Sequence, residues 1–201
     1  MAAEPGAVAK LVQLMGSSNE RVQHEVTEVL WYLAESRDDV RQHVAAQPGA
    51  LTALVQLLHG SDESEQASAG RVLGGLAGSD DLKQRVAAEP GALTVLVQLL
   101  DSDNLEVCEQ AAWVLEALAA SSDDLKQRVA AEPGALTALV LLLGSGNEDA
   151  LQSLALLAAD SDDIKQRVAA EPGALTALVQ RLGSGNKYAA RLGAAKALSS
   201  L

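Results

Sequence analysis

A recurring tripeptide, Pro-Gly-Ala, constrains the fold of this 201-residue chain more than any other sequence feature. Successive copies lie 43, 42, 43 and 39 residues apart, and they use all five prolines: Pro5, Pro48, Pro90, Pro133 and Pro172. The surrounding string SDDLKQRVAAEPGALT is identical at 79–94 and 122–137, and it recurs at 161–176 with Ile164 in place of leucine. A period of about 42 residues in helix-forming composition predicts a solenoid of stacked helical units.

Each period is predicted to contain three helices. The first is short, as in DDLKQRVAA at 80–88, where Ser79 can cap the N-terminus and the two aspartates favour the positive end of the helix dipole. Pro90 ends this helix because it has no amide hydrogen, and Gly91 permits a sharp turn into the second helix, ALTVLVQLL. The third helix is the longest, at about 105–120 in the middle unit. Thr and Gln four residues apart mark the water-facing stripe of the second helices.

The segments GALTALV at 134–140 and EQAAWVLEALA at 109–119 resemble the second and third helices of the armadillo repeat family, found in importin-alpha and beta-catenin. The resemblance implies an all-α, right-handed superhelical armadillo-like solenoid of about 4.5 three-helix repeats. We expect a single domain, 1–201, with repeats at 5–47, 48–89, 90–132 and 133–171 and a partial repeat at 172–201.

The same resemblance implies that the third helices line a concave groove that holds an extended peptide. In peptide-binding members, a Trp and an Asn four residues apart on each third helix hold that peptide. The Trp-type positions here carry Glu28, Arg71, Trp113, Gln152 and Lys196. The Asn-type positions carry Tyr32, Gly75, Ala117, Leu156 and Ser200. Only Trp113 matches and the asparagine ladder is absent, so importin-type recognition of nuclear signals is not supported.

The predicted function is therefore that of a non-enzymatic module that binds an extended peptide or protein segment on the concave face. The candidate groove residues are Glu28, Tyr32, Arg71, Glu109, Gln110, Trp113 and Lys196. The alternative is a structural scaffold, or a designed, consensus-like array, without a ligand of its own. Near-verbatim repetition favours duplication or design, whereas the shorter fourth unit and the lone Cys108 argue against pure design.

The charge balance bears on the class of partner. The chain has 27 acidic and 15 basic side chains, for a formal net charge of −12. Nucleic acids and anionic membranes are disfavoured because both are bound through Lys and Arg. A protein or peptide partner is expected, and the net charge favours a basic one. We expect a monomer, with end-to-end association of exposed repeat faces as the alternative.

No catalytic residue, metal site or cofactor is predicted. The paired aspartates are expected to be helix caps, and His24, His43 and His59 are expected on the surface. Cys108 lies beside Glu106 and Glu109, which would raise the pKa of its thiol. A single cysteine, together with no apolar run of membrane-spanning length and no basic N-terminal signal, predicts an intracellular protein, cytoplasmic or nuclear and not secreted.

Two departures from the repeat are visible in the sequence. The fourth unit is four residues shorter, and the loss falls in its third helix, NEDALQSLALLAA at 147–159. We expect either a local break in superhelical curvature or neutral drift. The terminal units carry Lys10 and Arg181 where inner units are apolar, as a solenoid end without a covering neighbour requires.

Overall fold

A computed structural model describes residues 5–36, 38–159 and 161–183, and these form thirteen helices and no strand. The helices are α1 (Pro5–Met15), α2 (Glu20–Ser36), α3 (Asp38–Ala46), α4 (Ala50–Leu58), α5 (Glu63–Leu76), α6 (Asp80–Ala88), α7 (Ala92–Leu99), α8 (Leu105–Ala119), α9 (Asp123–Ala131), α10 (Ala135–Ser145), α11 (Glu148–Ala158), α12 (Asp162–Ala170) and α13 (Ala174–Gly183). The all-α prediction is confirmed.

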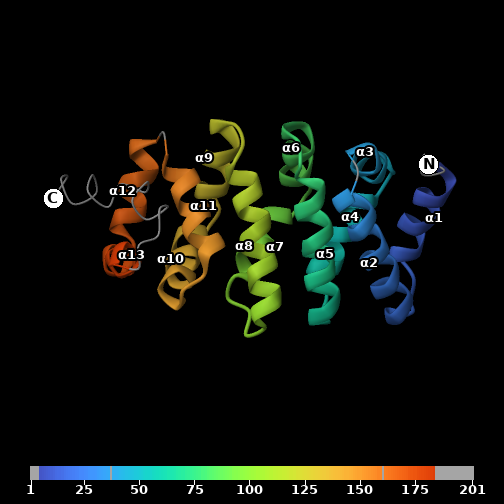
Figure 1. Cartoon of the computed structure of the whole chain (residues 1–201), viewed down its shortest axis with the longest axis horizontal. Coiled ribbons are helices and arrows are strands. Elements are labelled where there is room, and N and C mark those ends of the chain that lie inside the picture. The colour runs from blue at the N-terminus through green and yellow to red at the C-terminus, as the bar shows by residue number, and fades with distance from the viewer. Residues whose placement is uncertain (1–4, 37, 160, 184–201) are drawn as a thin grey trace. The chain divides into compact units, whose positions relative to one another are not determined.

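The helices fall into two compact units, and the dividing point, between Val114 and Leu115, lies within α8. The first unit contains α1 to α7 and most of α8, and the second contains the end of α8 and α9 to α13 (Figure 1). In the first unit, α2 and α5 lie side by side. The predicted single domain and its repeat boundaries stay predictions.

The order of helix lengths follows the repeat. Each of the sets α3 to α5, α6 to α8 and α9 to α11 has two helices of 8 to 11 residues followed by a third helix, and α6 has the predicted bounds. The third helices α2, α5 and α8 have 17, 14 and 15 residues, whereas α11 has 11. The lost residues of the fourth unit are therefore missing from its third helix, as predicted. Its effect on curvature stays a prediction.

The Pro-Gly-Ala tripeptide has a structural explanation. Gly49, Gly91, Gly134 and Gly173 all have φ between 78° and 81°, a left-handed conformation that glycine adopts without steric cost. The alanine after each of them is fully buried, with 0% exposure. The tripeptide thus ends one helix, reverses the chain and places a small side chain where the next helix enters the core.

The 16-residue string also supplies contacts between repeats. Ser161 Oγ accepts a hydrogen bond from the Ile164 amide at 3.3 Å, which caps α12 as predicted for the equivalent serines. Arg167 Nη2 donates to the Ala130 carbonyl of the preceding repeat at 2.6 Å. Thr137 Oγ1 donates to Glu171 Oε2 at 2.8 Å. The threonine stripe is exposed as predicted, and it also ties a second helix to the next repeat.

The core is built from Leu, Val and Ala. Leu54 and Leu73 in the first unit and Leu125 and Leu139 in the second are fully buried. Small alanines allow helices to approach closely, which suits a chain with almost no aromatic residues. Among the described residues, no single helix is long and apolar enough to cross a membrane. Helices α9 and α10 meet the length and composition test only when taken together, and they are bent by 85° relative to each other.

Replacing Gly49 by alanine is expected to lower the free energy of unfolding by about 1 kcal/mol, because its φ of 78° is strained for any residue with a Cβ. No atom lies within 4 Å of the added Cβ, so the cost is purely conformational. Gly144→Ala is the matched control, since Gly144 lies inside α10 with equally open space around it. That change should raise stability by about 0.5–1 kcal/mol. Chemical denaturation measures both, and effects of the same sign would contradict the interpretation.

Candidate interaction surface on the third helices

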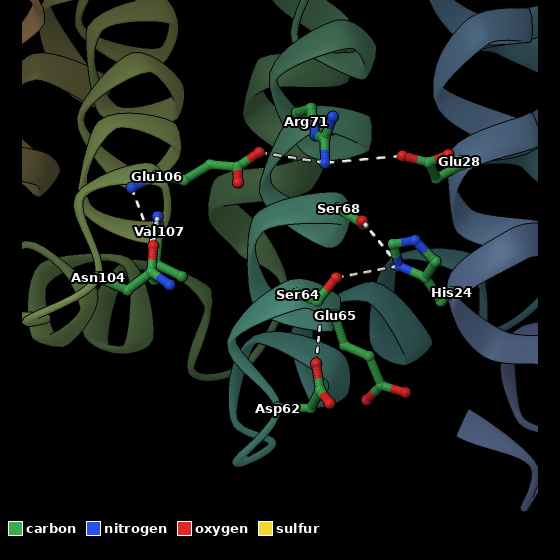
Figure 2. Close-up of polar contacts among 10 residues, drawn as sticks. All are labelled: His24, Glu28, Asp62, Ser64, Glu65, Ser68, Arg71, Asn104, Glu106 and Val107. Atoms are coloured by element: carbon green, nitrogen blue, oxygen red, sulfur yellow. Dashed lines mark hydrogen bonds and ion pairs between the residues drawn. The ribbon is translucent and has the colours of Figure 1, made fainter. Parts of the chain in front are cut away.

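Arg71 lies at the centre of the polar contacts that α5 makes with α2 and α8 (Figure 2). Its Nη2 lies 3.3 Å from Glu106 Oε1 and 3.8 Å from Glu28 Oε1. Its guanidinium carbon lies 5.1 Å from the ring centroid of Trp31, within the range of a cation–π contact. The side chain is 21% exposed, and its Nε is buried without a hydrogen-bond partner. The structure thus brings together Glu28 and Arg71, two predicted groove residues, and adds Trp31 and Glu106.

An aromatic pair follows Glu28 along α2. The rings of Trp31 and Tyr32 have centroids 4.5 Å apart and are tilted by 44°. Tyr32 is 58% exposed and Val29 is 44% exposed, while Trp31 is half-buried. The exposed part of α2 therefore presents the apolar surface of Tyr32 and Val29 close in sequence to the carboxylate of Glu28. This combination suits cationic side chains with long alkyl stems.

Trp113 packs against α5. A Cβ built on Gly74 would overlap the six-membered ring of Trp113, so the indole lies directly on the glycine backbone. Gln110 packs in the same way, because a Cβ on Gly70 would lie 2.9 Å from Gln110 Cβ. Trp113 and Gln110 are both half-buried, whereas Glu109 is exposed. The predicted anchor Trp113 thus has a packing role between α8 and α5.

Sequence reasoning missed Gly70 and Gly74 as the surface that receives these side chains. Two glycines four residues apart inside a helix lie on one face, and they could have indicated a close approach of a neighbouring element. Which side chain fills that space depends on how α8 stacks against α5, and this is a tertiary property.

His24 lies on α2 and contacts α5, and it is half-buried, so it is less exposed than a fully surface histidine. Its Nδ1 lies 3.3 Å from Ser64 Oγ and 3.5 Å from Ser68 Oγ (Figure 2). His43 and His59 are exposed, as expected. His24 thus connects α2 with α5, and these contacts explain why its side chain is half-buried.

Glu65 on α5 is a buried acid, with 8% exposure, and its Oε1 has no hydrogen-bond partner. Burial raises the pKa of its carboxyl group, and the nearby charges of Asp62 and Glu20 raise it further, against an opposing effect of His24. Asp62 accepts a hydrogen bond from the Glu65 amide at 2.9 Å and so caps α5. Burial of Glu65 at the start of α5 therefore disfavours the ionised form of its carboxyl group in the folded protein.

A second perturbed acid lies in the other unit. Glu116 accepts a hydrogen bond from Gln152 Nε2, which joins the end of α8 to α11. The pKa of Glu116 is raised to about 7: burial is the largest cause, the nearby charge of Asp149 adds to it, and the hydrogen bond from Gln152 opposes it. Gln152, which occupies a predicted Trp-type position, is therefore engaged within the protein.

Cys108 is buried, and its Sγ donates a weak hydrogen bond to the Leu100 carbonyl at 3.5 Å. Burial is the largest cause that raises the pKa of its thiol, followed by Glu109 and Asp101. The predicted direction is thus confirmed, but burial and Asp101 replace Glu106 as causes. Within 5–36, 38–159 and 161–183, no group of three or more His, Cys, Asp or Glu side chains could hold a metal ion.

Two further predictions concern the ends of the chain. Arg181 is directed to the preceding repeat, where its Nε lies 3.5 Å from the Leu143 carbonyl, and Lys10 is exposed. Lys196 and Ser200 lie outside the described residues.

Known proteins similar to this chain identify the repeat. The sequence matches the family model described as Armadillo/beta-catenin-like repeat at residues 1–35 and 79–120. A designed armadillo repeat protein in complex with the peptide (KR)4 is 30% identical, with a TM-score of 0.83 over 96% of this chain and 81% of that one. The chain belongs to the armadillo repeat family.

Two further solved structures agree with this armadillo fold. A second designed armadillo repeat protein is 30% identical, with a TM-score of 0.85 over 96% of this chain and 82% of that one. An engineered protein is 28% identical, with a TM-score of 0.86 over 96% of this chain and 84% of that one. No curated protein matches the sequence. The predicted armadillo solenoid is thus confirmed. This fold supports a role in protein interaction or as a scaffold.

Within the armadillo frame, α2, α5, α8 and α11 are the third helices. Their Asn-type positions carry Tyr32, Gly75, Ala117 and Leu156. Of these, only Tyr32 has a polar side-chain group, and it is also the most exposed. The surface therefore differs from an asparagine ladder, and it offers an aromatic ring and carboxylates as its chemistry.

Proposed function

We propose that the third helices of the first unit bind an extended, basic segment of another protein, without catalysis. The observation that carries this proposal is the exposed Tyr32 ring on α2, together with the carboxylates of Glu28 on the same helix and of Glu106 and Glu109 on α8. The armadillo neighbour solved with the alternating Lys-Arg peptide (KR)4 supports a cationic, extended ligand class. The net charge of −12 would steer such a ligand toward the protein.

The binding mode follows from the side chains available. Carboxylates can pair with Lys and Arg of the ligand, and a cation over the Tyr32 ring contributes about 0.5–1 kcal/mol at an exposed site. The Asn-type positions Gly75, Ala117 and Leu156 have no polar side-chain group that could bond the peptide backbone. Affinity then rests mainly on charge, so it should fall as salt concentration rises.

The same proposal includes a monomer that acts inside the cell and does not bind nucleic acid or membranes. Its support is the acidic charge balance and a single, buried cysteine, which suits a reducing compartment. A scaffold without its own ligand is the competing function. The scaffold is favoured by contacts within the protein. Arg71 pairs with Glu106 of α8, and Trp113 and Gln110 of α8 pack on the glycines of α5, so these side chains already have partners on a neighbouring third helix.

The test is peptide-display selection on the purified chain, followed by calorimetry with (KR)4. Tyr32→Ala is the informative variant because its ring is exposed, whereas Trp113→Ala would also remove packing against Gly74. Leu141→Gln is the control, since Leu141 is 64% exposed on α10, where other repeats carry Gln. We expect Lys- and Arg-rich peptides and a loss of about 2- to 5-fold in affinity for Tyr32→Ala alone.

Two results would contradict the proposal. Enriched peptides that bind Tyr32→Ala as well as the parent would place the site elsewhere. Selection without any enrichment, together with no heat of binding to (KR)4, would favour the scaffold.

A further inference from the structure

We propose that Arg71 is an internal ligand of this surface: its guanidinium fills a cation subsite formed by Trp31, Glu28 and Glu106. A basic side chain of the partner would enter this subsite only when Arg71 leaves it. The inference rests on the proposed function for the identity of the partner, but the subsite itself can be tested with a small cation.

The subsite has the chemistry that a guanidinium requires. Trp31 supplies an aromatic ring whose centroid lies 5.1 Å from the guanidinium carbon. The carboxylates of Glu28 and Glu106 lie on α2 and α8, the third helices of the repeats before and after that of Arg71. Trp31 is not at a Trp-type position, which in this repeat carries Glu28. The subsite therefore uses an aromatic residue outside the family's Trp-type position and is separate from Trp113, which is packed on Gly74.

The fit of Arg71 is incomplete. Its two ion pairs, at 3.3 and 3.8 Å, use the same nitrogen, Nη2, and the side chains of Glu28 and Glu106 are 36% and 56% exposed. Its Nε is buried without a partner, which carries a desolvation cost that no bond offsets. A guanidinium that is not tethered to α5 can choose its orientation and present two nitrogens to a carboxylate. Arg71 is therefore an exchangeable occupant.

A consequence for specificity follows. While Arg71 occupies the subsite, its positive charge repels a Lys or Arg of the ligand from the centre of the first unit. Tyr32 and Glu109 remain accessible on α2 and α8. Removing the guanidinium should thus strengthen binding of (KR)4, by about 3- to 30-fold, the range to which one cation–π contact of up to 2 kcal/mol corresponds.

The experiment titrates ethylguanidinium into Arg71→Ala and follows the indole N–H signals of Trp31 and Trp113 by NMR. Arg71→Gln is a second variant, which removes the positive charge but keeps a longer side chain than alanine, in case the alanine variant folds poorly. Arg71→Lys is the matched control because it keeps a cation in place. We expect a saturable shift of the Trp31 signal in the two vacated variants, and none in Arg71→Lys or the parent.

Adding Glu106→Gln to the vacated variant should weaken that saturation, since one of the two carboxylates is then neutral. A Trp31 signal that does not respond to ethylguanidinium in either vacated variant would overturn the subsite. Calorimetry with (KR)4 separates the two proposals. Ethylguanidinium saturation without peptide binding supports the subsite and counts against the proposed function, whereas peptide binding without saturation does the reverse.

Discussion

Replacing Gly74 by alanine is expected to lower the free energy of unfolding by about 2–3 kcal/mol, the cost of forcing an extra methyl group into a packed site. The added Cβ would overlap Cζ3 and Cε3 of Trp113 and lie 2.8 Å from its Cη2. These atoms belong to one rigid ring, so relief requires α8 or the whole indole to move away from α5. Chemical denaturation monitored by circular dichroism and by tryptophan fluorescence measures the loss.

The neighbouring glycine provides the control. In Gly75→Ala the added Cβ would lie 3.7 Å from Ala34 Cβ, which is ordinary van der Waals contact. Because Gly75 is inside α5, this change should raise stability by about 0.5–1 kcal/mol through helix propensity. Trp113→Leu in the Gly74→Ala background should recover part of the loss, since the smaller side chain leaves room. Equal stability of Gly74→Ala and Gly75→Ala would contradict the close packing of Trp113 on α5.

Glu116→Gln is expected to raise the free energy of unfolding by about 1–2 kcal/mol at pH 8, and by less at pH 5. In the folded protein the pKa of Glu116 is raised from an ordinary value of 4.5 to about 7, chiefly by burial. The unfolded chain therefore loses the proton first, and the parent loses stability as pH rises from about 4.5 to about 7. The size is kept moderate because the carboxyl group is only half-buried and water still screens it.

The measurement is a series of urea denaturations of parent and variant between pH 5 and pH 8. The stability difference should grow through this window and level off only about one unit above the folded pKa of about 7, where both states of the parent are ionised. The glutamine can still accept the hydrogen bond from Gln152, so the comparison isolates the charge. A difference independent of pH would show that the carboxyl group titrates normally.

The bounds of the short first helix of a repeat were predictable because the signals that set them are local. The serine before α6, the aspartates of its first turn and the proline after it define that helix within one stretch of sequence. The same holds for the left-handed glycines, whose conformation follows from the turn they make. The exact repetition of one string made these assignments mutually consistent across the chain.

The candidate site was predictable only as positions, not as contacts. The family pattern placed Glu28, Arg71 and Trp113 on third helices, and the structure confirms that α2, α5 and α8 carry them. It did not indicate that Arg71 would lie over Trp31, or that Trp113 would rest on Gly74. Each of these pairs joins residues about 40 positions apart, so the contact depends on the stacking register of two repeats.

The sequence by itself thus determined the repeat, the three-helix order, the shortened α11 and the acidic character, since each depends on neighbouring residues or on composition. The tertiary structure decided which side chains face each other between repeats and which acids are buried. Glu116 and Glu109 illustrate this difference, because both lie on α8, but Glu116 is half-buried against α11 and Glu109 is exposed. The physical reason is that burial and pairing arise from the packing of one helix on the next, and no single repeat contains that information.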